Sequence, residues 1–102
     1  MDMGELMKHA QQFQERLSKI QAELGEKNVT GSAGGGMVSA TFNGRSELMQ
    51  ISIEKDAVNP EDVQMLQDLI VSAVNDGLVK AKKLGQGALG KLTGGMNIPG
   101  LF

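Results

Sequence analysis

The apolar residues of the first 24 positions recur with the spacing of a helical contact seam. They stand, in steps of four, three, four, three and four, at Leu6, Ala10, Phe13, Leu17, Ile20 and Leu24. This spacing gives a narrower stripe than the apolar face of a helix lying on a globular core, and it is typical of a helix that packs along a second helix. We therefore expect a helix from about Gly4 to Leu24 with Gly25 as its C-terminal cap.

The pattern changes to a period of two in the middle of the chain, which indicates β-strands. The β-prone segments cover residues 28–33, 37–42 and 48–54. Asn43-Gly44, between the second and third segments, favours a tight hairpin turn because both residue types tolerate positive φ. In the third segment Met49, Ile51 and Ile53 share one apolar face. We expect a three-stranded antiparallel meander.

A second long helix is predicted after residues 59–62, which read Asn-Pro-Glu-Asp. An N-cap residue, a proline at the first helical position and two acids mark a helix start. Apolar residues then recur at helical spacing to Leu84, on a broad face that suits the sheet. The fold class is therefore α+β, with one domain over residues 1–84 and a flexible Gly-rich tail over residues 85–102, anchored at Ile98, Leu101 and Phe102.

Composition adds that a monomer would have a poorly filled core. The chain of 102 residues has 14 glycines, three phenylalanines and no tryptophan or tyrosine, so we expect it to oligomerise. The absence of cysteine excludes disulfides and thiolate metal sites. We find no apolar run of about 18 residues and no secretory signal, and we therefore expect a cytoplasmic protein without a membrane span.

Charge is distributed unevenly, although the net charge is only −2. A slightly acidic total argues against strong indiscriminate attraction to nucleic acid. No acidic residue follows Asp76, whereas Lys80, Lys82, Lys83 and Lys91 do follow it. Two interpretations of these lysines stay open: a solvated helix end, which the helix dipole favours, and a basic contact surface.

The sequence offers no set of catalytic or metal-binding residues. His9 is the only histidine, and no second base accompanies the serines and threonines. Residues 85–90 match the dinucleotide pattern G-x-G-x-x-G, but they follow a helix where that motif needs a strand, and we attribute the match to chance. We expect neither enzyme activity, nor a metal ion, nor a cofactor.

Four segments spread over nearly the whole chain carry a family resemblance. They are residues 6–14 (LMKHAQQFQ), 29–36 (VTGSAGGG), 68–76 (DLIVSAVND) and 97–100 (NIPG). In this order they resemble the YbaB/EbfC family of bacterial nucleoid-associated proteins. The resemblance implies a homodimer whose paired helices project like tweezers and hold double-stranded DNA with little sequence preference, in the bacterial cytoplasm at the nucleoid.

The resemblance also implies where DNA is contacted: the polar face of the first helix and the late part of the second. The predicted contacts are Lys8, His9, Gln12, Arg16, Lys19, Lys80, Lys82 and Lys83. An alternative is a protein-interaction module, in which the Gln-rich first helix and the C-terminal tail bind another protein and DNA binding is incidental. A third interpretation is a purely structural dimer.

Overall fold

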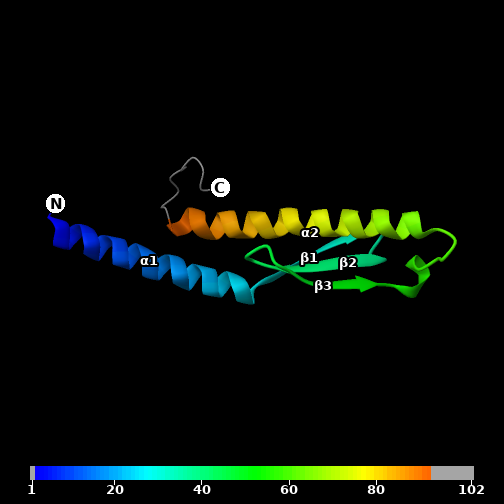
Figure 1. Ribbon diagram of the computed structural model, residues 1–102, viewed down its shortest axis with the longest axis horizontal. Helices are drawn as coiled ribbons and strands as arrows, with labels where there is room; N and C mark the ends of the chain where they lie inside the picture. Colours follow the sequence, from blue (N-terminus) through cyan, green and yellow to red (C-terminus); the bar gives the residue numbers. More distant parts are fainter. Residues whose placement is uncertain (1, 93–102) are drawn as a thin grey trace.

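The computed structural model describes residues 2–92 and consists of two long helices and a small sheet (Figure 1). Its elements are α1 (Met3–Glu26), β1 (Asn28–Ala33), β2 (Val38–Asn43), β3 (Leu48–Ile53), a 3-10 turn η1 (Lys55–Ala57) and α2 (Val63–Leu92). The expected order of helix, three-stranded sheet and helix is confirmed. The molecule is elongated, 69 by 23 by 16 Å, because α1 runs away from the sheet and projects past the end of α2 (Figure 1).

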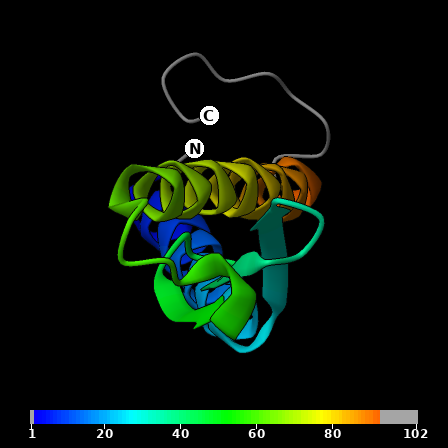
Figure 2. The ribbon, with the colours of Figure 1, turned by 90° about the vertical axis from the view of Figure 1, so that its right-hand side faces the viewer.

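The sheet is antiparallel in the order β1-β2-β3, and α2 lies across one of its faces (Figures 1 and 2). Its register shifts at the start of β3, so that Phe42 pairs with Leu48 while Thr41 pairs with Gln50. Met49 is the additional residue of this bulge and interrupts the alternation that the sequence predicted. Ile51 keeps the expected place against the core.

The turn between β2 and β3 lies where it was predicted but differs in type. Its hydrogen bond runs from the Ser46 N–H to the Asn43 carbonyl (3.1 Å), and the positive φ falls on Ser46 (65°), not on Asn43-Gly44. Gly44 has another reason to be glycine. A Cβ there would lie 2.7 Å from the Leu24 carbonyl oxygen, to which the Gly44 N–H donates a 2.8 Å hydrogen bond. The hairpin therefore packs directly on the last turn of α1.

The predicted start of the second helix and the Gly25 cap need correction. α1 continues through Gly25, and Lys27 is the cap residue that donates its N–H to the Leu24 carbonyl. α2 begins at Val63, four residues after the Asn59 that the sequence favoured. The Asp62 carboxylate accepts from the Met65 N–H (3.1 Å), so it supplies the N-terminal cap of the helix instead.

The prediction that the second helix ends at Leu84 is wrong, because α2 continues to Leu92. Glycine weakens an isolated helix, but contacts with the rest of the fold override that preference. Here α2 packs against α1, and Ala88 and Leu89 in its last turns are half-buried. Residues 85–92 are therefore helical. The expected anchor at Ile98, Leu101 and Phe102 lies outside the described residues.

The core is built mainly from small side chains, which brings α2 close to the sheet. Its fully buried members are Val38, Ala40, Phe42, Ala57, Ala73 and Ala81. The closest approach joins two glycines: a Cβ on Gly31 in β1 would overlap the backbone nitrogen of Gly77 in α2 and lie 2.5 Å from the Ala73 carbonyl oxygen. This glycine crossing fixes α2 over β1 and β2.

Candidate nucleic-acid interface

The apolar seam of α1 is covered at one end only. Leu24 is 3% exposed where α1 meets α2 and the hairpin, and Leu17 and Ile20 are half-buried. Towards the N-terminus Phe13 is 47% and Leu6 53% exposed, and Ala10 between them is also exposed. Within residues 2–92, the seam therefore has a partner only along its C-terminal part. The partner of its N-terminal part stays a prediction.

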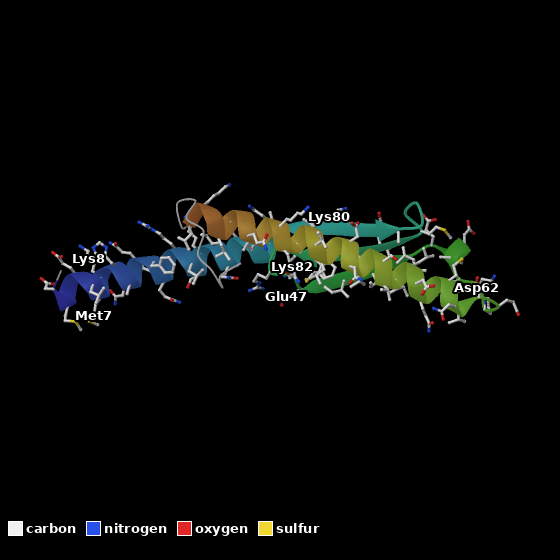
Figure 3. All side chains as sticks on the ribbon, turned by 90° about the horizontal axis from the view of Figure 1, so that it is seen from above. Met7, Lys8, Glu47, Asp62, Lys80 and Lys82 are labelled. Carbon is white, nitrogen blue, oxygen red and sulfur yellow. The ribbon has the colours of Figure 1, made fainter. Side chains whose placement is uncertain are left out.

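A cationic stripe runs along the projecting part of α1, about 120° around the helix from the seam. We use the term α1 stripe for Lys8, Gln12, Arg16 and Lys19, with His9 beside them. All five side chains are exposed, and Lys8 points away from the side that carries Met7 (Figure 3). Lys8 and Lys19 lie about 16 Å apart along the axis at about 1.5 Å per residue.

The charges of the α1 stripe are available to a ligand. Within residues 2–92, none of its side chains forms an ion pair or a hydrogen bond. Glu5 and Glu23 lie on the same side of the helix and the exposed Glu15 lies one turn before Lys19, so carboxylates are interspersed among the cations along the whole stripe. Such a surface suits weak binding to a polyanion.

The predicted lysines of α2 do not form one surface. Lys80 turns to the outer edge of β1, where its Nζ donates to the Thr30 carbonyl (3.0 Å) and pairs with Asp76 (3.3 Å). Lys82 leaves the opposite side of α2 (Figure 3). Lys83 is exposed. At about 100° per residue, Lys82 is turned well away from both of the other lysines, whereas Lys83 lies one helical turn from Lys80 on the same side of α2.

A hollow lies where α1, the hairpin and the end of α2 meet. One cavity of about 440 Å³ is lined by Arg45 and Lys82 among others, and a second of about 300 Å³ by Lys27 and Lys91. Leu24 lines both cavities, and Glu23 is the only acidic side chain in either lining. Lys27 and Arg45 come from different elements, so sequence spacing gives no sign that they meet here, whereas Lys91 belongs to the acid-free run after Asp76.

Two carboxylates hold the basic groups nearest to the sheet. The Ser32 N–H (3.0 Å) and then the Lys80 ammonium lower the pKa of Asp76 below its ordinary value. The Asn43 amide (2.9 Å) and then the Arg45 guanidinium lower the pKa of Glu47 in the same way. Arg45 and Lys80 are therefore partly neutralised within the fold, unlike the cations of the α1 stripe.

Other chemistry has little support in the part of the chain that the structure describes. Across residues 2–92, no three or more His, Asp or Glu side chains gather where they could hold a metal ion. In the same range, neither α1 nor α2 combines the length and apolar character that crossing a membrane requires.

A long helix with unpaired cations, projecting from a helix-covered sheet, defines a binding protein with an extended contact arm. The chain belongs to the YbaB/EbfC DNA-binding family, whose model matches residues 1–96. The resemblance seen in the sequence is therefore confirmed. This is a family of nucleoid-associated DNA-binding proteins and not of enzymes.

Individual relatives agree with the family assignment. A nucleoid-associated protein of Clostridium acetobutylicum is 49% identical over 100 residues, which cover 98% of this chain and 89% of the relative. One of Syntrophobacter fumaroxidans is 47% identical over 95 residues, covering 93% and 86%. The crystal structure of an uncharacterized protein from Helicobacter pylori has a TM-score of 0.82 at 27% identity, covering 91% of this chain and 98% of that one.

Proposed function

We propose that this protein binds double-stranded DNA as a homodimer, with little sequence preference, at the nucleoid of the bacterial cytoplasm. The observation that carries the proposal is the α1 stripe: exposed, unpaired cations on the arm that projects beyond the rest of the fold. Membership of a DNA-binding family supports the choice of DNA as the polyanion.

The contacts are made to phosphates rather than to base edges. Lysine and arginine side chains that meet phosphate oxygens position a protein on the duplex but do not read its sequence. Each phosphate contact releases counterions, so binding weakens as salt rises, and non-specific binders typically show Kd values of about 10⁻⁴ to 10⁻⁶ M. The net charge of −2 keeps this protein at the weak end of that range.

A homodimer doubles the number of such contacts by presenting two arms to one duplex. The α1 stripe carries the main contacts, and Lys82 and Lys83 add to them. Lys80 contributes least because its ammonium is already held by Asp76 and Thr30. The predicted DNA contacts are thus ranked by whether each cation is already paired within the fold.

Fluorescence anisotropy with two labelled duplexes of unrelated sequence, at low and at physiological salt, tests the proposal. Lys19→Ala removes one stripe cation from each arm, and at about 0.9 per phosphate contact it should reduce the slope of log K against log salt by roughly 2. Lys55→Ala is the matched control, because Lys55 is also exposed but lies in η1, at the other end of the molecule from the arm.

The outcomes separate the alternatives. Binding to both duplexes, with the loss confined to Lys19→Ala, supports a non-specific clasp. Equal effects of Lys19→Ala and Lys55→Ala on the salt slope would show that the α1 stripe does not contact DNA. Absence of binding to either duplex at low salt would refute the proposal and favour a protein-interaction module that uses the Gln-rich arm and residues 85–102.

A further inference from the structure

A cavity of about 440 Å³ lies at the root of α1, between three elements that are far apart in the sequence. Leu24 enters it from α1, Arg45 and Ser46 from the β2–β3 hairpin, and Lys82 and Leu89 from α2. Its volume falls within the range of about 300–1,000 Å³ that is typical of sites for small molecules. We call it the junction cavity, and its size suits one small molecule.

Gly85 keeps the junction cavity open. The α2 residues in its lining recur at helical spacing and share one face: Lys82, Gly85, Gln86 and Leu89. A Cβ on Gly85 would meet the Gly44 carbonyl oxygen at 3.4 Å, and any longer side chain would extend into the cavity. Residues 85–90, which match G-x-G-x-x-G, lie inside α2. Side chains, and not the N–H groups of a phosphate loop, therefore face the cavity.

The Arg45 guanidinium is fixed in the cavity lining and still has free donors. Its Nε pairs with the Glu47 carboxylate (3.1 Å), and its Cζ and Nη2 atoms lie 3.1 Å from the place of a Cβ on Gly25. The group is therefore held between the hairpin and α1. Within residues 2–92, neither of its Nη atoms has a hydrogen-bond partner. A planar guanidinium presented in this way suits the oxygens of an anion.

Lys82 brings a second cation to the same cavity. It projects from the side of α2 on which Glu47 lies (Figure 3), and within residues 2–92 its ammonium has no ion-pair or hydrogen-bond partner. Of the described residues, no acidic one lines the cavity, and Glu47 is already bound by Asn43 and Arg45. Two cations that share a cavity repel each other unless an anion lies between them. The junction cavity therefore favours an anionic ligand.

Ser46 adds a hydroxyl group at a backbone position that favours glycine. Its φ of 65° lies in the left-handed region, which is unfavourable for residues with a Cβ and which glycine usually occupies in short hairpin loops. The half-buried side chain lines the cavity, and its hydroxyl has no hydrogen-bond partner within residues 2–92. A strained residue with an unpaired donor in a cavity is typical of a binding site.

The rest of the lining combines apolar side chains with amides. Leu24 is 3% exposed and Leu89 is half-buried, so both offer apolar surface to a ligand. Gln21 and Gln86 are exposed, and each amide carries two donors and an acceptor. A nucleobase has the complementary properties, because its face packs on apolar side chains and its edge carries donors and acceptors.

We propose that the junction cavity binds a free nucleoside monophosphate, with the phosphate between Arg45 and Lys82 and the base against Leu24 and Leu89. A phosphate monoester carries close to two negative charges and three acceptor oxygens, which match the two cations and the Ser46 hydroxyl. The cavity is separate from the α1 stripe, so this inference goes beyond the proposed function. A nucleotide bound there bridges α1, the hairpin and α2, and it stabilises their joint.

An NMR titration of the ¹⁵N-labelled full chain with adenosine 5′-monophosphate tests the proposal. The amide signals of residues 44–46 and 85–89 should shift and saturate. Adenosine and inorganic phosphate should each bind at least about tenfold more weakly, because each keeps only one part of the contacts. Lys82→Gln should weaken nucleotide binding by about tenfold or more, since a hydrogen bond to a charged group is lost. Lys55→Gln is the matched control, because Lys55 is an exposed lysine in η1, outside the cavity lining.

A second variant fills the cavity without changing a charge. Gly85→Leu places a side chain in the space of the ligand and should abolish the saturable shifts. Gly87→Leu is its matched control: it lies in the same helix, where no atom of residues 2–92 beyond its own stretch of helix backbone is within 4 Å of an added Cβ. Far-UV circular dichroism checks that both variants are folded. Both should keep the salt slope of DNA binding, because the α1 stripe is unchanged.

The outcomes distinguish this inference from the proposed function. Absence of saturable shifts, or equal affinities of Lys82→Gln and Lys55→Gln, would overturn the nucleotide site and leave the DNA clasp intact. Inorganic phosphate that binds as tightly as the nucleotide would overturn a nucleoside as part of the ligand. Cavity shifts that a DNA duplex causes and Gly85→Leu abolishes would assign the cavity to a phosphate of DNA and overturn a free nucleotide. A wild type that binds the nucleotide but neither duplex would refute the DNA clasp and support this inference.

Discussion

Replacement of Gly31 by alanine tests the closest contact in the fold, the crossing of β1 and α2. A Cβ at Gly31 would lie 2.5 Å from the Ala73 carbonyl oxygen and 2.5 Å from the Gly77 Cα, and ordinary contacts begin at 3.4 Å. The neighbouring atoms belong to the backbone, so no flexible side chain can move aside. β1 and α2 must therefore separate by at least about 1 Å, the shortfall of these contacts, because the Gly77 nitrogen lies closer still.

This separation should be costly because it spreads along the whole interface between β1, β2 and α2. Overpacking a core costs typically about 1–3 kcal/mol, and a clash with backbone belongs at the upper end. Alanine also restricts the unfolded chain, which raises the free energy of unfolding by only about 0.4–1 kcal/mol. The free energy of unfolding should therefore fall by about 2 kcal/mol. With a urea dependence of about 2 kcal/mol/M, the midpoint drops by about 1 M.

Urea unfolding followed by far-UV circular dichroism measures this change, since the chain has no tryptophan or tyrosine for fluorescence. All variants are compared at one protein concentration, because association stabilises the folded state. Gly87→Ala is the matched control: it lies in α2, where no atom of residues 2–92 beyond its own stretch of helix backbone is within 4 Å of the added Cβ, and it should gain about 0.5–1 kcal/mol. A Gly31→Ala midpoint at or above that of the wild type would refute the close crossing.

Three further predictions concern the seam, the carboxylates and the hairpin. Leu24→Ala should lower the free energy of unfolding by about 2–5 kcal/mol and Leu6→Ala by less than about 0.5 kcal/mol in urea titrations, and equal losses would contradict the uneven burial of the seam. The pKa values of Asp76 and Glu47 are lowered from 3.8 and 4.5, so their stabilisation is present above those values and is lost as pH falls through the folded-state pKa. Urea midpoints measured from pH 6 to pH 2 should fall in that window, less steeply for Asp76→Asn, and identical slopes would contradict the role of this carboxylate. Asn43 is 2% exposed and accepts from the Arg45 and Glu47 N–H groups, so Asn43→Ala should cost about 1–3 kcal/mol and speed amide exchange in the hairpin. Unchanged exchange there would contradict that role.

The order of helices and strands was predictable because it follows from the local periodicity of apolar residues. The local signals are a period of 3.5 residues along α1, an alternation in β2 and a helix start signal before α2. Each of them can be read without knowing the tertiary contacts. The errors lie where tertiary contacts decide. Gly25 and Gly85 read as breaks, but both are helical because α1 and α2 are supported by the hairpin and by each other. Gly44 read as a turn residue, but its lack of a side chain serves the contact with Leu24.

The candidate site was predictable only in part, for a related reason. The α1 stripe lies on one exposed helix, so sequence spacing alone places its members on one face. The lysines of α2 are close in sequence, yet Asp76 and the Thr30 carbonyl hold the Lys80 ammonium at the β1 edge, although its side chain stays exposed. Arg45 and Lys27 come together with Lys82 and Lys91 around Leu24 only through folding.

The joint between α1 and the hairpin connects the fold to the proposed function. The Gly44 N–H donates to the carbonyls of Leu24 (2.8 Å) and Lys27 (3.0 Å), and the Arg45 guanidinium lies against Gly25. These contacts hold the root of α1 to the sheet, whereas the side chains of the α1 stripe further along the helix are exposed and form no ion pair or hydrogen bond within residues 2–92. Because the root is fixed, the two subunits of the proposed homodimer would hold their α1 arms at a set separation. A clasp that contacts phosphates and not bases needs arms at a fixed separation, because the width of the duplex is constant.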